Sequence, residues 1–432
     1  MNSDLTESVQ ASIRPGEMVD TYYYGETNLE KQAYPAVCNT RFVQQFTNLG
    51  AGSSQFVISP QGGVSDIICQ FATPIANATL YTSLALDQGW GYNLINRISV
   101  RYGSSAQYFW SGTQMFLQNL IDAETDSKAV SLSTFGGNAV IGNGSSATVP
   151  TAGTCSGAVA YVYLKLPHNS IRASGKPLPF PSDLLVQPIV VTIELFSLQS
   201  IFINSNSAGS LATAPTALAS AQLQVKQEML TDTSDLLARR VDMNSHAYTL
   251  PLMYFAQQET QVQVSSSASS TAQSVNLTGF RAGEVKSIVL WLTPAGNAST
   301  PGSGGYQPNS WQLMNNIVLT YNGEIFSRFD SGSNQLWNLA SAEKSASYSQ
   351  VQYSTAATGT TSVTSYWTQC PFAQVSVPFD NEMKLIHGKP ILNAVVNLTF
   401  DVPALSSSYV LHAMYLYNAS LLCSRGSAEY IF

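Results

Sequence analysis

The amino-acid sequence predicts an all-β protein built from two similar halves, and three observations lead to this prediction. Apolar and polar residues alternate over many short segments, which is the pattern of strands that bury one face. The stretches between these segments are rich in Gly, Ser, Thr, Asn and Pro, residues that favour turns and loops. Several sequence blocks also occur twice, in the same order.

The alternation is clear in two segments. In 97–102 (RISVRY) every second residue is apolar, and in 190–196 (VVTIELF) the apolar positions include Val191, Ile193 and Leu195. Successive side chains of a strand point to opposite faces. Both segments are therefore predicted to be strands with one face in a core.

The repeated blocks extend over most of the chain. "LINRISVRY", which begins at Leu94, resembles "LMNNIVLTY", which begins at Leu313, 219 positions later. Five further pairs keep the order at separations of 211 to 220 positions: RFVQQFTN and YFAQQETQ, GVSDIICQFATP and GEVKSIVLWLTP, FWSG and FDSG, VYLKLP and AQVSVP, and GKPL and GKPI. Unequal loops would produce these small differences in separation, so the pattern predicts a duplicated fold.

Each half combines short strands with long polar loops, which favours an antiparallel sandwich of the jelly-roll type. We predict two tandem eight-stranded jelly rolls, at 36–225 and 246–432, preceded by an N-terminal arm at 1–35. The connector at 226–245 contains "KQEMLTDTSDLLARRVDM", and its Asp and Thr residues before "LLARR" predict a capped, short helix.

The alignment of the two halves predicts which residues are equivalent. Ile98 and Ile317 should occupy equivalent buried positions, as should Phe71 and Trp291. If these pairs lay on different strands, the duplication would be refuted.

Two long loops are predicted to face solvent or other subunits. The stretches Thr134–Gly157 and Thr293–Ser310 are rich in Gly, Ser and Thr and lack the apolar residues that would bury them. Replacing several residues at Gly142–Ser146 should therefore leave folding and assembly intact.

Composition excludes several classes of protein. Charged residues make up 10% of the 432 residues, against about 25% in an average protein, and the net charge is −7 with no basic run longer than Arg239-Arg240. Specific nucleic-acid binding is therefore not expected. The start "MNSDLTESVQ" has no signal-peptide pattern and no apolar run approaches 18 residues, so neither secretion by a signal peptide nor a membrane-spanning helix is expected.

The sequence also gives little support for catalysis or for a metal or other cofactor. The five cysteines (Cys38, Cys69, Cys155, Cys370 and Cys423) contain no C-x-x-C pair, and we expect reduced, mostly buried thiols. The four histidines (His168, His246, His387 and His412) are too far apart in sequence for a metal motif. The pair Asp122 and Glu124 is the kind of acidic neighbour that chance supplies among 26 acidic residues. We expect no catalytic, cofactor-binding or metal-binding residues.

The chain resembles the double jelly-roll major capsid proteins of tailless icosahedral double-stranded DNA viruses, a family that includes large nucleocytoplasmic viruses, virophages and membrane-containing phages. The resemblance rests on the duplication and on three passages: "TYNGEIFSRFDSGSNQLWNLAS", "DTSDLLARRVDMNSHAYTLPL" and "LPHNSIRASGKPLPFPSDLLVQPIVVTIEL".

This resemblance implies a structural protein that acts in the virion. Three copies would form a homotrimeric, hexon-like capsomer that contacts neighbouring capsomers and minor capsid or penton proteins, with assembly in the host cytoplasm. The arm at 1–35 could reach under the shell, towards an internal viral membrane.

Two alternatives stay open at this point. One is a related scaffold that shapes a viral membrane without entering the mature shell. The other is a tandem β-sandwich that binds carbohydrate, stacking sugars on exposed aromatic residues such as Tyr22, Tyr23, Tyr24 and Trp110.

Overall fold

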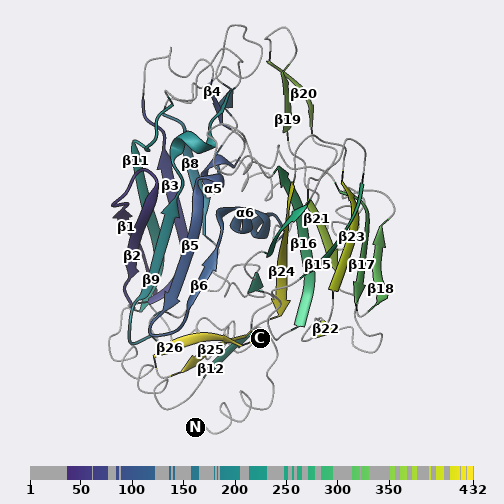
Figure 1. Cartoon of the computed structure of the whole chain (residues 1–432). Coiled ribbons are helices and arrows are strands. Elements are labelled where there is room, and N and C mark those ends of the chain that lie inside the picture. Colours follow the sequence, from purple (N-terminus) through teal and green to yellow (C-terminus); the bar gives the residue numbers. More distant parts are fainter. Residues whose placement is uncertain are drawn as a thin grey trace.

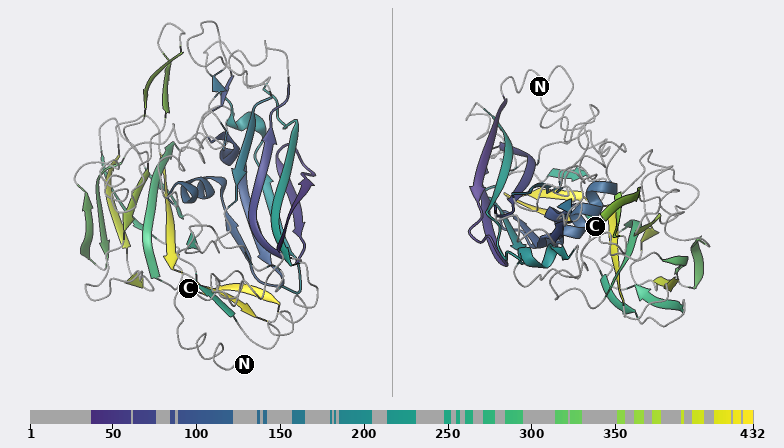
Figure 2. Two further views of the ribbon diagram at one scale, coloured as in Figure 1. Left: turned by 180° about the vertical axis from the view of Figure 1, so that it is seen from behind. Right: turned by 90° about the horizontal axis from the view of Figure 1, so that it is seen from above.

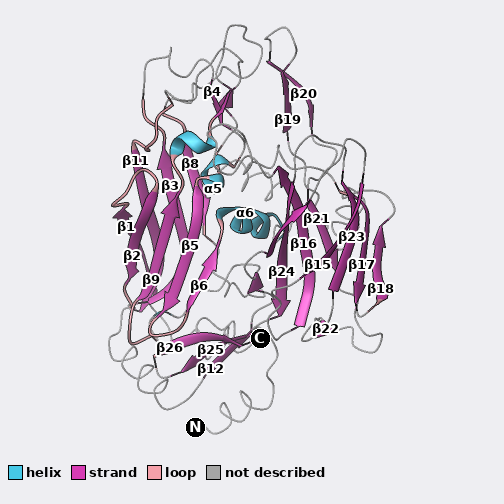
Figure 3. Cartoon of the chain, viewed as in Figure 1, coloured by secondary structure: helices cyan, strands magenta, loops and turns pink. Residues whose placement is uncertain are grey.

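In a computed structural model, the chain forms two antiparallel β-sandwiches side by side, with helix α6 (Gly112–Ile121) between them (Figures 1 and 3). The structure describes residues 37–60, 62–75, 84–86, 89–121, 136–137, 140–141, 157–164, 180, 182, 185–204, 214–230, 248–251, 255–256, 260–264, 271–277, 284–294, 314–321, 323–329, 351–355, 361–366, 372–376, 389–390, 396–402, 409–418, 420–424 and 426–431.

The first sandwich consists of two four-stranded sheets. One sheet has the order β1 (Val37–Gln45), β11 (Ser220–Leu230), β3 (Gly62–Ala72) and β8 (Val159–Tyr163). The other has the order β2 (Gly52–Ile58), β9 (Ile189–Leu195), β5 (Ile95–Tyr102) and β6 (Gln107–Trp110). All neighbours are antiparallel, and the early strands β1 and β2 pair with the late strands β11 and β9, as in a jelly roll.

The second sandwich repeats this arrangement. In one sheet, β13 (Phe255–Ala256) and β14 (Thr260–Val264) pair with β24 (Tyr409–Asn418), followed by β16 (Glu284–Pro294) and β21 (Phe372–Ser376); β22 (Lys389–Pro390) pairs with the start of β16. The other sheet has the order β15 (Thr271–Leu277), β23 (Val396–Val402), β17 (Asn315–Tyr321) and β18 (Glu324–Phe329).

The smaller elements lie outside these sheets. They are β4 (Leu84–Leu86), β7 (Val140–Ile141) and β10 (Ile203–Asn204), which form one sheet, the hairpin of β19 (Val351–Thr355) and β20 (Thr361–Tyr366), the helical turn α5 (Trp90–Asn93) and the 3-10 turn η3 (Leu198–Ile201).

The two halves correspond strand by strand, which confirms the predicted duplication. Ile98 on β5 and Ile317 on β17 are both buried on the third strand of their sheets. A β-bulge interrupts both strands near the start, beside Asn96 and beside Asn316. The bulges lie near the same end of two corresponding strands, which agrees with the duplication.

The pair Phe71 and Trp291 is only partly as predicted. Both residues are buried on corresponding strands, β3 and β16, but on opposite faces of their sheets. Phe71 packs against Phe46 in the core of the first sandwich, whereas Trp291 joins the hydrophobic cluster that the second half shares with the first. The second core is filled instead by Ile288, Leu290 and Leu292. The alignment failed here because both faces of β16 are buried over 288–292 (IVLWL), a stretch with no polar residue to mark the outer face.

The predicted connector helix is wrong at its start. Lys226–Leu230 belong to strand β11, which pairs with β1 and β3 along its length. The rest of the connector, from 231 to 245, lies outside the described residues. The predicted boundary of the first jelly roll at 225 therefore cuts through a strand.

Part of the first predicted loop is packed, contrary to expectation. Gly136 and Gly137 are buried, and their carbonyls accept hydrogen bonds from the backbone N–H groups of Gly91 and Gly89, both at 2.8 Å. A Cβ on Gly137 would lie 2.4 Å from the Trp90 ring, so only glycine fits. In the second predicted loop, Thr293 is buried at the end of β16. Val140–Ile141 also form strand β7, which pairs with β4. Most of the remaining residues of both loops, including Gly142–Ser146, lie outside the described residues, and their exposure stays a prediction.

A third sheet joins the two halves. It consists of β12 (Tyr248–Pro251), β25 (Ser420–Ser424) and β26 (Ser427–Ile431), and it lies across one end of the first sandwich (Figures 1 and 2). These residues fall within the predicted second jelly roll, yet they pack against the first one. No sequence pattern indicated that strands from the second half pack on the first sandwich.

Candidate functional site

The buried interface between the sandwiches is the first feature that a structural role would require. Trp291 is 1% exposed and stacks on the imidazole of His412, with ring centroids 5.0 Å apart and an interplanar angle of 5°. The hydroxyl of Thr293 and Nε2 of His412 form a hydrogen bond of 2.7 Å. Met414 and Leu416 complete this face of the sheet. The interface is thus a packed apolar layer in which the Thr293 hydroxyl and Nε2 of His412 are hydrogen-bonded to each other.

Helix α6 lies in this interface (Figure 1). Residues 114–119 are all buried, the polar Gln114, Gln118 and Asn119 included, as expected of a helix enclosed on every side. Its start is fixed by a reciprocal pair of bonds: the Gln114 N–H donates to Ser111 Oγ at 3.1 Å, and the Ser111 N–H donates to Gln114 Oε1 at 2.8 Å. This is a capping box.

A buried polar network ties α6 to the first sandwich. Asn119 Nδ2 donates to the Tyr92 hydroxyl at 2.9 Å and to the Tyr163 carbonyl at 3.0 Å. The backbone N–H of Tyr163 also donates to the Tyr92 hydroxyl, at 3.3 Å. Burial raises the pKa of Tyr92 to about 12, although these donors act in the opposite direction. Tyr92 is therefore neutral and structural at physiological pH.

The third sheet, of β12, β25 and β26, which we name the C-terminal sheet, contacts the first sandwich through tyrosines. The hydroxyls of Tyr430 on β26 and Tyr102 on β5 lie 2.8 Å apart, and the backbone N–H of Tyr430 donates to the Tyr108 hydroxyl at 3.1 Å. The rings of Tyr108 and Tyr430 meet edge to face with centroids 4.6 Å apart. The Val186 N–H donates to the Gly426 carbonyl at 3.0 Å.

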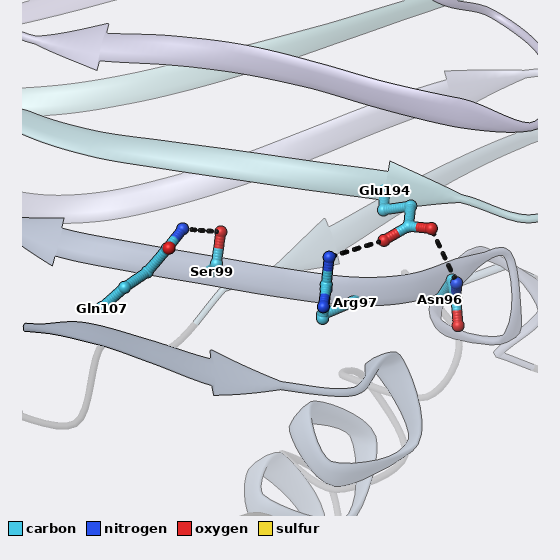
Figure 4. A network of polar contacts seen from close by, with 5 residues as sticks. All are labelled: Asn96, Arg97, Ser99, Gln107 and Glu194. Atoms are coloured by element: carbon cyan, nitrogen blue, oxygen red, sulfur yellow. Dashed lines mark hydrogen bonds and ion pairs between the residues drawn. The ribbon is translucent and has the colours of Figure 1, made fainter.

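The two outer surfaces of the first sandwich differ in chemistry. On the sheet with β5 and β9, Arg97 forms an ion pair with Glu194 at 3.2 Å, Asn96 donates to the same carboxylate, and Gln107 donates to Ser99 (Figure 4). Arg97 is largely exposed, so this ion pair contributes little to stability.

The outer surface of the other sheet is dominated by amides, and we name it the glutamine face. Gln222 and Gln224 on β11 both donate to Gln70 on β3, and Gln45 on β1 donates to Gln222. Half-exposed apolar side chains flank these amides: Val43 is 51% exposed, and Val159 and Tyr161 are each 42% exposed. An ion pair between Lys226 and Asp66, at 3.7 Å, lies near the middle of these strands.

The residues considered for chemistry do not form a catalytic site within the described part of the chain. No group of three or more His, Cys, Asp or Glu side chains is placed to hold a metal ion among the described residues. His412 lies in the interface, while His168, His246, His387, Asp122 and Glu124 lie outside the described residues. The thiol of Cys69 is free and buried, and burial raises its pKa. The expectation of no catalytic, metal or cofactor site stays a prediction.

The carbohydrate-binding alternative loses one of its aromatic candidates. Trp110 is 1% exposed and stacks on Tyr108 in the core, so it is not available to a sugar. Tyr22, Tyr23 and Tyr24 lie outside the described residues. None of the described helices combines the length and the apolar character needed to cross a membrane.

Comparison with known proteins supports the fold directly. No family model matches the chain, and no curated protein matches its sequence. Solved structures do match: the PBCV-1 virus capsid superposes with a TM-score of 0.59 at 12% identity, covering 92% of this chain and 97% of that chain. The chain is a double jelly roll.

Other structures with the double jelly-roll fold agree over nearly the same length. A protein of the Sputnik virophage, solved by cryo-EM, has a TM-score of 0.52 at 11% identity, with 91% of this chain and 88% of that chain covered. The Faustovirus major capsid protein has a TM-score of 0.50 at 10% identity, with 98% of both chains covered. Coverage of this length includes both jelly rolls in each case.

Sequence reasoning missed three features of this double jelly roll. The capping box of α6 was visible as Ser-x-x-Gln before an apolar run. The glutamine face was visible as the alternation in "AQLQVKQ". No local sequence pattern predicts the contact of Tyr430 with Tyr102, because the two residues are 328 positions apart.

Proposed function

We propose that the chain is the major capsid protein of an icosahedral virus and serves a structural, non-catalytic role in the virion. The single observation that supports this most strongly is the match of both jelly rolls, in tandem, over 92% of this chain and 97% of the PBCV-1 capsid chain. A tandem match of this length leaves little of either chain for another activity.

The proposed unit of assembly is a homotrimer. Two similar jelly rolls in each chain and a three-fold axis place six similar units in a ring, which lets one protein tile a sheet. The low charge of the chain, 10% of residues, supports this proposal because the centres of protein interfaces are depleted of charged residues.

The proposed partners are other trimers, minor capsid or penton proteins, and an internal viral membrane reached by the arm at 1–35. The proposed place of assembly is the host cytoplasm. The arm lies outside the described residues, so its role rests on the resemblance described above.

Electron microscopy of the purified protein tests the proposal. We expect three-fold capsomers or hollow polyhedra, and native mass spectrometry should give three times the mass of 46.5 kDa. A monodisperse monomer at high concentration would refute the capsid role. Antibody labelling of particles from the source separates shell from scaffold, because a scaffold would be absent from mature particles.

A further inference from the structure

The outer faces of the two corresponding sheets differ in burial: one is covered and the other is not. In the second sandwich, the face of β24 and β16 that points away from its own core carries Val289, Trp291 and Met414, and it is buried against the first sandwich. In the first sandwich, the corresponding face of β11 and β3 is the glutamine face, which no part of the described chain covers. Of these two corresponding faces, the one in the second jelly roll is thus used for contact within the chain, and the glutamine face in the first jelly roll is left open.

From this difference we infer that the glutamine face is a docking surface for the second jelly roll of another copy of this chain. The inference rests on the proposed function and adds the surface to it. Within one chain, the outer face of β24 and β16 in the second jelly roll lies against the first jelly roll, on the side where α6 lies (Figure 1). Repeating the same head-to-tail contact between chains places the glutamine face against the second jelly roll of the next chain. A heterologous contact closes into a ring when the rotation between neighbouring chains is a whole fraction of a turn, as in the proposed trimer.

The chemistry of the glutamine face suits a protein partner with low charge. The charged residues of its four strands are two basic and two acidic: Arg41, Lys226, Asp66 and Glu228. The strand pairing places Arg41, Lys226 and Asp66 in one row and Glu228 two residues further along β11, so all four lie in the part of the sheet that β8 does not reach. The rest of the face consists of amide, hydroxyl and apolar groups. Amides donate and accept equally well, so another neutral surface can approach without leaving a buried charge unpaired.

Exposed apolar side chains gather at the uncharged end. Val159 starts β8 and lies in the same row as Ala72 of β3. Ile75, just beyond β3, is 89% exposed and lies close to Gly157, which precedes β8. Tyr161, one row further, presents the kind of aromatic side chain that is enriched in interfaces. These groups lose contact with water only if another molecule covers them.

The size of the glutamine face also fits a subunit contact. Its strands have 9, 11, 11 and 5 residues. At a rise of about 3.3 Å per residue and a strand spacing of about 4.8 Å, they span on the order of 600 Å². This approaches the roughly 800 Å² that each partner contributes to a stable, specific interface.

Charge variants test the inference by native mass spectrometry and light scattering. The double change Val43→Glu and Tyr161→Glu adds two negative charges to half-exposed positions. We expect it to convert the trimer to a monomer, weakening association by at least about 100-fold, because like charges on a desolvated surface oppose docking. The matched control is Val57→Glu, which is 50% exposed on β2, in the other sheet of the same jelly roll, and should leave the trimer intact.

A second variant guards against a change in folding. Gln70 uses Oε1 to accept bonds from Gln222 and Gln224, so Gln70→Glu keeps both bonds and adds only a charge. We expect this variant to melt within a few degrees of the native protein and to associate at least about tenfold more weakly.

The outcomes separate this inference from the proposed function. If the native protein is a trimer and both variants remain trimers with native affinity, the glutamine face is not the docking surface, although the capsid proposal stands. If the native protein is a monomer at every concentration, the capsid proposal fails and this inference fails with it. Loss of the trimer in the double variant and weaker association of Gln70→Glu, with the Val57→Glu trimer intact, support the inference.

Discussion

At the scale of single residues, Trp291 shows how one side chain can link two folding units. It belongs to the second jelly roll by chain position, and its ring is buried in the cluster shared with the first. Its stacking partner His412 lies on the neighbouring strand and bonds to Thr293. The ring therefore supports the fold of one half and its attachment to the other.

Replacing Trp291 with alanine should lower the free energy of unfolding by about 3–5 kcal/mol, because it removes a large, fully buried ring. The control is a set of serine and alanine replacements at Gly142–Ser146, which should leave folding and trimer formation unchanged. Thermal melts measure both. A loss from the loop variant that equals or exceeds that of Trp291→Ala would contradict the assignment of core and surface.

Tyr92 makes stability depend on pH in the alkaline range. Its pKa rises from 10 when unfolded to about 12 when folded, so the folded state favours the neutral phenol. The stabilisation is complete below pH 10 and is lost as the pH rises to 12, amounting to about 2–3 kcal/mol.

The test compares native protein with Tyr92→Phe in urea melts from pH 8 to 12. At pH 8 the variant should be less stable by about 1–3 kcal/mol, because Asn119 and the Tyr163 N–H lose their acceptor. This difference should shrink above pH 10. A difference that is constant with pH would show that Tyr92 titrates normally in the folded protein.

At the scale of elements, the sequence predicted strands best where each strand has one buried and one solvent-exposed face. The segments around Ile98 and Ile193 alternate as predicted, and their apolar positions are buried. The prediction failed where that contrast is missing, as on β16, which is buried on both faces, and at Lys226–Leu230, where a charged segment continues a strand at the sheet surface. Contacts made through distant residues, such as those of Tyr430, leave no local pattern at all. The absence of a catalytic motif guided the functional interpretation, whereas the proposed docking surface could be located only from the strand register.

Helix α6 offers a prediction at this scale. Ser111→Ala removes the side chain that accepts the Gln114 N–H and should lower stability by about 0.5–2 kcal/mol. Thermal melts measure the loss. Ser111→Asp is the control, since its carboxylate also accepts the bond and should restore most of the stability. If Ser111→Asp were as unstable as Ser111→Ala, the capping role would be wrong.

At the scale of the whole molecule, the two jelly rolls should unfold together. The cluster that contains Trp291, Met414 and Tyr430 also contains the core of the first jelly roll, so neither half can open without exposing apolar surface of the other. We expect one transition in calorimetry, with a calorimetric enthalpy equal to the van't Hoff enthalpy. Two separated transitions in the native protein would contradict this coupling. Trp291→Ala should broaden or split the transition, since it weakens the shared cluster.

The contact between Tyr102 and Tyr430 also sets an order of events during synthesis. The two residues are 328 positions apart, and a ribosome that adds about 5–20 residues per second separates them by tens of seconds. During that interval the end of the first jelly roll has no cover over Tyr102 and Tyr108. A polypeptide that ends before β26 keeps these rings accessible to chaperones and proteases, whereas one that includes β26 hides them. The C-terminal sheet thus gives the cell a physical means of telling finished subunits from unfinished ones.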